Sequence, residues 1–167
     1  MLQGQSIGAA ITAVENDIKA KPADADLRAA LVQLLCLSGN WTRANAQLKS
    51  WQALKPIAQP TTLLLMQSVN AELQRQAVFA GTAAPALLRQ DQPWLKLIVQ
   101  ALHQDAQGAT EQAQALRDEA LEAAPAGAGR LTLAEGDQER QLRFDWLTDG
   151  DGRLGPVCEL ALNGVYY

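Results

Sequence analysis

Hydrophobic side chains recur every three or four residues along most of the chain, which is the spacing of one face of an α-helix. The first run places Ile7, Ile11, Val14 and Ile18 on one stripe and predicts a helix over about 5–20. Similar runs predict helices over about 25–37, 41–54, 61–80, 94–106 and 110–124. Glycines and prolines stand where these runs end, and both residue types stop helices. The pattern therefore predicts a mainly α protein.

Two of the predicted helix pairs share the same landmarks: a glycine that ends one helix, a small alanine that lets two helices approach, and a proline that stops the second. These sets are Gly39, Ala44 and Pro56, then Gly108, Ala113 and Pro125, with a partial copy at Ala10 and Pro22. The two full sets are 69 positions apart (Gly39 to Gly108). That offset is close to twice the period of about 34 residues found in tetratricopeptide units. The repeat predicts tetratricopeptide-like antiparallel helix pairs, a scaffold with a groove for a binding partner.

After Pro125 the hydrophobic period falls to two, which is typical of β-strands. Leu142, Phe144 and Trp146 alternate with polar residues and predict one strand, and 157–162 predicts another. The run from Asp149 to Gly152 is expected to be a hairpin-type turn. The Asn163–Gly164 turn signal has no expected strand after it. We therefore predict a helical domain over 1–125 and a short β-rich segment over 126–167, the start of an α+β extension in a truncated domain.

Composition and charge limit the class of partner. The chain is 48% hydrophobic and 19% charged, with a net charge of -4 and scattered basic residues. Nucleic-acid binding needs a basic patch, so it is not expected. Cys36 and Cys158 are too few for a disulfide framework, and no apolar run reaches the roughly 18 residues that span a bilayer. A cytoplasmic protein without membrane insertion is predicted.

Candidate chemistry is sparse. His103 and Asp105 are two positions apart on a helix and do not face each other. Asp145, Asp149 and Asp151 resemble calcium ligands, but the terminal glutamate of such a loop is missing and Arg153 would repel the ion. No catalytic residue, cofactor or metal site is predicted, and a hydrolase or metal enzyme remains the weakest alternative. The four tryptophans could line a binding groove or pack in the core, and we expect the core role for each: Trp41, Trp51, Trp94 and Trp146.

Three segments together resemble one known family. They are the run from Leu34 to Trp41 followed by Arg43 and Ala44, the run from Arg75 to Gly81, and the run from Phe144 to Pro156. All three are similar to the ImpE/TagJ family of type VI secretion accessory proteins. The residues of the last motif are Asp145, Trp146, Asp149, Asp151, Arg153, Gly155, Pro156 and Glu159.

The resemblance implies a cytoplasmic, non-enzymatic adaptor that binds the N-terminal helix of the small contractile-sheath subunit and is linked to the ClpV ATPase that recycles the sheath. Family members are usually longer, with a β-rich part after the Tyr166–Tyr167 segment. The motif from Asp145 to Glu159 is therefore expected to lack packing partners in this chain. The alternative function is a generic tetratricopeptide-like chaperone or assembly scaffold.

The adaptor hypothesis places an amphipathic partner helix in a groove between helices, with apolar burial giving the affinity. Charged residues are expected to set the orientation of the partner helix. The residues expected to contact it are Arg28, Arg43, Trp51, Arg75 and Trp94.

Overall fold

The computed structural model describes residues 4–89, 91–136 and 138–167. Tertiary contacts divide the chain into two compact units. Unit 1 contains Met1–Gln76 and Ala161–Tyr167, and unit 2 contains Ala77–Leu160. The domain boundary predicted between 125 and 126 lies inside unit 2, and that division stays a prediction.

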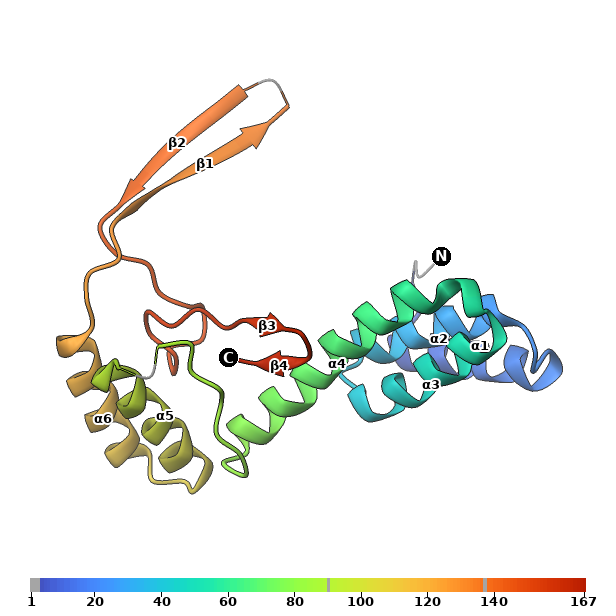
Figure 1. The fold of residues 1–167 in the computed structure, drawn as a ribbon, viewed down its shortest axis with the longest axis horizontal. Helices are drawn as coiled ribbons and strands as arrows, with labels where there is room; N and C mark the ends of the chain where they lie inside the picture. Colours follow the sequence, from blue (N-terminus) through green and yellow to red (C-terminus); the bar gives the residue numbers. More distant parts are fainter. Residues whose placement is uncertain (1–3, 90, 137) are drawn as a thin grey trace. The chain divides into compact units, whose positions relative to one another are not determined.

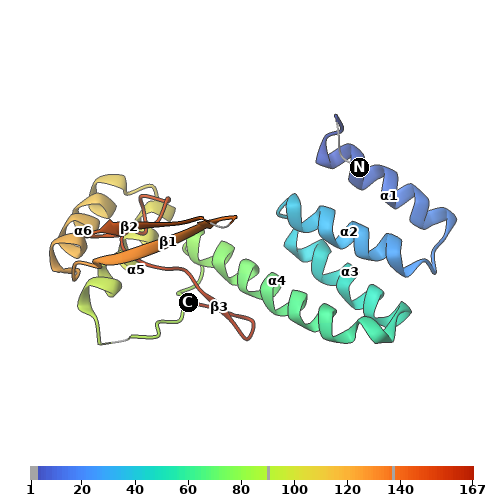
Figure 2. The same ribbon diagram turned by 90° about the horizontal axis from the view of Figure 1, so that it is seen from above.

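Unit 1 is built from stacked helices. Its elements are α1 (Ile7–Ala20), α2 (Ala25–Leu37), α3 (Trp41–Leu54), the short 3-10 helix η1 (Pro56–Ala58) and most of α4 (Gln59–Phe79). The first three helices lie side by side and alternate in direction (Figures 1 and 2). The predicted antiparallel helix arrangement is confirmed, and the bounds of α2 and α3 coincide with those predicted from the sequence.

Local hydrogen bonds explain where these helices begin and end. The Asp24 carboxylate accepts from the backbone N–H groups of Asp26 and Leu27, at 3.0 and 3.2 Å, and so caps the start of α2. At the end of α2, Gly39 takes a φ of +69°, and the Asn40 N–H donates to the Leu35 carbonyl at 2.9 Å. The same closure recurs at Gly81 and Gly108, which also have positive φ. The predicted glycine stops are therefore confirmed.

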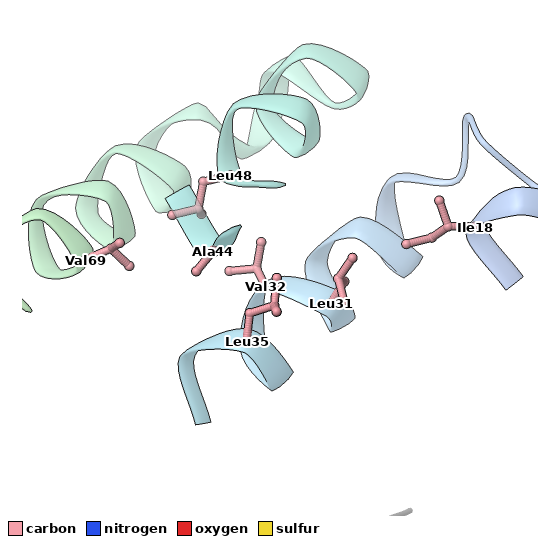
Figure 3. Close-up of a cluster of buried hydrophobic side chains, with 7 residues drawn as sticks. All are labelled: Ile18, Leu31, Val32, Leu35, Ala44, Leu48 and Val69. Atoms are coloured by element: carbon pink, nitrogen blue, oxygen red, sulfur yellow. The ribbon is translucent and has the colours of Figure 1, made fainter. Parts of the chain in front are cut away.

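The core of unit 1 lies between α1, α2, α3 and α4. Its buried side chains come from all four helices and point toward one another in Figure 3: Ile18, Leu31, Val32, Leu35, Ala44, Leu48 and Val69. Ala44 is completely buried, as expected of a small residue at a close helix approach. Trp41 and Trp51 pack against this cluster, which agrees with the predicted core role of both.

The C-terminal residues of unit 1 form a very short hairpin. Strands β3 (Ala161–Leu162) and β4 (Val165–Tyr166) pair antiparallel across Asn163 and Gly164, whose φ angles are +52° and +80°. Positive φ at both central residues is the geometry of a type I′ turn. The expectation that no strand follows the Asn163–Gly164 signal was wrong, because only two residues are needed to use the turn.

Gln74 of α4 holds this hairpin through its side-chain amide. The Gln74 Nε2 donates to the Gly164 carbonyl at 2.7 Å, and the Tyr166 N–H donates to Gln74 Oε1 at 3.2 Å. We expect Gln74→Ala to lower the hairpin stability by about 1 kcal/mol, the value of one or two net hydrogen bonds. The backbone amide of Tyr166 should then exchange with solvent several-fold faster. Gln76→Ala, a change on the same helix, is the matched control and should leave that exchange rate unchanged.

Unit 2 contains a second helix pair, α5 (Pro93–Ala106) and α6 (Thr110–Ala123). Ala101, Ala113 and Ala120 are fully buried, so the two helices approach closely. A buried ion pair crosses them, with Arg117 Nη1 at 2.6 Å from Asp105 Oδ2. The Gln114 carboxamide oxygen also accepts from Arg117 Nε at 3.3 Å. Asp105 therefore pairs with an arginine of the next helix.

A two-stranded ribbon follows α6 in the chain. Strands β1 (Gly129–Glu135) and β2 (Gln138–Phe144) pair antiparallel, with Leu131 opposite Leu142. The strand predicted around 142–146 is partly confirmed, because β2 covers 142–144 but ends at Phe144, before Trp146. The expected partner at 157–162 was wrong, since β2 pairs with β1, which precedes it in the chain and was not predicted. Within 157–162 only Ala161–Leu162 is a strand, and it pairs with β4.

The predicted mainly α class with a short β segment is confirmed. Of the helices that the structure describes, none combines the length and apolarity that a bilayer-crossing segment needs.

Candidate protein-binding site

A groove in unit 2 offers a concavity for a protein segment. It has a volume of about 450 Å³ and runs between the segment that follows α4 and one face of α5. Val78 and Val99 give it apolar walls, and Ala83 and Ala84 add small side chains. Polar groups of α5 form the other side: Gln100, His103 and Gln104. We call this concavity the Gly81 groove, after the glycine in its lining.

Gly81 explains why the chain can run so close to α5. It ends α4 with a φ of +69°, and a Cβ added there would lie 2.7 Å from Ala106 Cβ and 3.4 Å from His103 Nδ1. Any other residue would therefore push the segment away from α5 and would also strain its backbone. The glycine predicted as a helix stop thus also shapes the groove.

His103 lies on the exposed side of α5 and lines the Gly81 groove. Its Nε2 is 2.8 Å from the Gln107 side-chain nitrogen. Asp105 is held by Arg117 instead, so the two residues do not form a catalytic pair. In the ranges that the structure describes, no group of three His, Cys, Asp or Glu residues could hold a metal ion. The groove therefore offers amide and imidazole hydrogen bonds beside apolar surface, which suits a polypeptide ligand.

Three of the residues predicted to contact a partner have internal contacts in unit 1. Arg28 Nη1 donates to Gln47 Oε1 at 2.8 Å and links α2 to α3. Arg43 forms an ion pair with Glu15 of α1. Trp51 packs against the core, and its Nε1 is buried without a hydrogen-bond partner among the described residues. These contacts hold helices together, and a partner-binding role for these residues stays a prediction.

The other two predicted contacts lie further along the chain. Arg75 is a half-buried residue of α4 in unit 1. Trp94 is in the first turn of α5 in unit 2, where its Nε1 donates to Gln92 Oε1 at 3.3 Å. The five predicted contacts are thus shared between two units. None of the five lines the Gly81 groove.

The acidic motif after β2 forms a compact loop. Asp149 Oδ1 accepts from the Asp151 N–H at 2.7 Å, and Asp151 Oδ1 accepts from the Arg153 N–H at 3.0 Å. The Asp149 N–H donates to the Gly155 carbonyl at 2.8 Å and closes the loop. Both aspartates therefore satisfy backbone donors. The expected hairpin-type turn was wrong, because no strand pair flanks this loop.

Arg153 explains why these aspartates do not form a cation site. Its guanidinium lies 2.6 Å from Asp151 Oδ2, through Nη2, and 4.5 Å from the centroid of the Phe79 ring. The arginine thus neutralises Asp151 and stacks on the last residue of α4.

The loop also has packing partners within unit 2, so the expectation that it lacks them was wrong. Leu154 is almost fully buried, and Gly155, with a φ of +61°, sits against Leu121 of α6. A Cβ at Gly155 would lie 3.0 Å from Leu121 Cδ2. Pro156 and Glu159 are half-buried, whereas Asp145 and Trp146 are exposed. The core role expected of Trp146 was therefore wrong, since its side chain is 67% exposed. The motif therefore reads mainly as a structural loop.

Three features of unit 2 were not predicted from the sequence: the β1–β2 ribbon, the Asp105–Arg117 ion pair and the Gly81 groove. A signal for the ribbon was present, because Leu131 and Leu133 alternate with Arg130 and Thr132 on one side of Gly136, and Leu142 and Phe144 alternate with Gln141 and Arg143 on the other. No local signal marks the groove, since its lining comes from two helices and a connecting segment.

Comparisons with known proteins are consistent over nearly the whole chain. No family model matches. The chain is 39% identical over 166 residues to the type VI secretion system accessory component TagJ of Pseudomonas aeruginosa, a match that covers 99% of this chain and 56% of that protein. The crystal structure of protein VPA1032 from Vibrio parahaemolyticus is similar with a TM-score of 0.81 and 30% identity, over 96% of this chain and 57% of that one. The chain thus spans little more than half the length of these two relatives.

Proposed function

Because the chain belongs to the ImpE/TagJ family, we propose that it is a non-enzymatic accessory protein of a type VI secretion system. In this proposal it acts as an adaptor that binds the N-terminal helix of the small contractile-sheath subunit and assists sheath recycling with the ClpV ATPase. The observation that carries the proposal is the similarity to TagJ over 99% of the chain.

The Gly81 groove is the proposed docking site for the sheath-subunit helix. An amphipathic helix binds a groove by placing apolar side chains one turn apart against an apolar wall. Val78 and Val99 supply that wall, and the groove residues of α5 run from Val99 to Gln104. Six residues of a helix cover about 9 Å, a little under two turns, so two successive anchor residues of a partner helix fit. Gln100 and Gln104 are available to bond polar groups at the edge of that helix.

Titration with a peptide that copies the N-terminal helix of the sheath subunit tests the proposal. We expect amide resonances of 81–84 and 99–104 to shift as the peptide is added. Ala84→Arg places a long charged side chain at the groove and should weaken binding at least tenfold. The matched control is Ala53→Arg, at an exposed position of α3, and it should leave the affinity unchanged.

The outcomes separate the function from its site. An absence of any shift at millimolar peptide would remove the adaptor function. A peptide that binds Ala84→Arg as tightly as the unsubstituted chain would keep the function and refute the groove as its site.

A further inference from the structure

In the β1–β2 ribbon of unit 2, neither outer strand edge pairs with another strand of the described residues. Each strand pairs extensively with the other, and no helix that the structure describes packs broadly against them. A two-stranded ribbon is marginally stable alone, and open edges present unpaired N–H and C=O groups along their length. The outward backbone groups of each strand are therefore available to a further strand.

One face of the ribbon is apolar and exposed. The pairing register places Leu131 opposite Leu142 and Gly129 opposite Phe144, and the period of two adds Leu133 to the same face. Leu131 is 48% exposed and Leu133 is 38% exposed. A Cβ at Gly129 would lie 2.6 Å from Phe144 Cζ, so the Phe144 ring covers that end of the face. Such a face is stabilised when a further layer or strand covers it.

The opposite face carries two arginines at its base, and its acidic residue Glu139 lies nearer the tip of the ribbon. Arg130 lies directly opposite Arg143, and both are exposed. Like charges at directly opposed positions destabilise a strand pair. Arg140, the third arginine of the ribbon, pairs with Leu133 and therefore lies on the apolar face. Among the described side chains, no acidic residue forms an ion pair with any of these three arginines. The ribbon base, 129–133 with 140–144, contains no Asp or Glu.

We propose that the β1–β2 ribbon is a docking element for an extended partner segment in which acidic and apolar side chains alternate. The segment adds as a third strand on a ribbon edge, so that its main chain satisfies the edge hydrogen bonds. Its apolar residues extend the Leu131–Leu142 face. Its carboxylates lie on the face that carries Arg130 and Arg143, next to the arginine of the strand that the segment joins. This recognition differs from helix docking in the Gly81 groove and does not depend on it.

The probe is a ten-residue peptide of alternating glutamate and valine with blocked ends, added to the full chain. A lysine–valine peptide of the same length is its control. We expect the glutamate peptide to slow amide exchange in β1 and β2 and the lysine peptide to leave it unchanged. The double change Arg130→Glu with Arg143→Glu should weaken binding of the glutamate peptide at least tenfold and create binding of the lysine peptide.

Arg143→Gln serves as a second variant that keeps the ribbon neutral at that position, and it should weaken binding by a smaller factor. Ala84→Arg, in the Gly81 groove, should leave ribbon binding unchanged, which separates this proposal from the adaptor function. Equal binding of both peptides, or unchanged amide exchange with each, overturns the proposal. Concentration-dependent protection of ribbon amides without peptide also overturns it, because a second copy of the chain would then occupy the edge.

Discussion

Replacing Asp105 by alanine lowers the free energy of unfolding of unit 2 by about 3 kcal/mol. The change leaves the Arg117 guanidinium without its carboxylate in a position where its side chain is only 10% exposed. Removing one partner of a buried ion pair costs about 3 to 5 kcal/mol, since the remaining charge is desolvated without compensation. We expect the lower end of this range, because 16% of the Asp105 side chain still meets water. Chemical denaturation, with hydrogen exchange over 93–123 to locate the loss, measures the effect.

The control for this prediction removes both charges. The double change Asp105→Leu with Arg117→Met should recover most of the lost stability, since a buried pair is often replaced by apolar residues at little cost. If the double variant is as unstable as Asp105→Ala, the loss comes from packing and not from the unpaired arginine.

Leu48→Ala lowers the free energy of unfolding of unit 1 by about 3 to 4 kcal/mol. The Leu48 side chain is 0% exposed and lies in the cluster that joins α1, α2, α3 and α4. Truncation removes buried methyl groups and leaves a cavity, and the cost of such a change ranges from about 2.7 to 5 kcal/mol. Loss of helical circular dichroism in urea, followed together with the fluorescence of Trp41 and Trp51, measures it.

Leu64→Ala is the matched control on α4, at a position that is 64% exposed. It makes the same side-chain change within a helix and should cost less than about 0.5 kcal/mol. Similar losses for both variants would mean that Leu48 does not sit in a closely packed core.

The elements predicted correctly share one property: their signals lie within a few residues of chain. Helix α2 shows this. The Asp24 carboxylate at its start accepts hydrogen bonds from residues two and three positions later, and the Gly39 N–H at its end donates to the carbonyl of Cys36 in the last turn. The stripe of leucines that faces the core also follows from a local period. The similarity to TagJ confirms the family resemblance drawn from short motifs.

The missed features depend on residues that are distant in the sequence or on other elements. β1 was overlooked because strand identity depends on the partner strand across Gly136, and the Ala-Gly run before it favours a flexible segment. Arg117 reads as a surface arginine until α6 packs beside α5 and brings it to Asp105. The run from Asp149 to Gly152 was expected to be a hairpin-type turn because the sequence does not reveal that the strands on either side of it belong to different sheets.

The sequence alone determined the helices, their order and their ends, because the hydrogen bonds of a helix and its caps close within about five residues. Only the tertiary structure decided which strands pair, which arginine is buried and where a groove remains. Those features arise when separate elements pack, and their partners are set by geometry that no single stretch of chain contains.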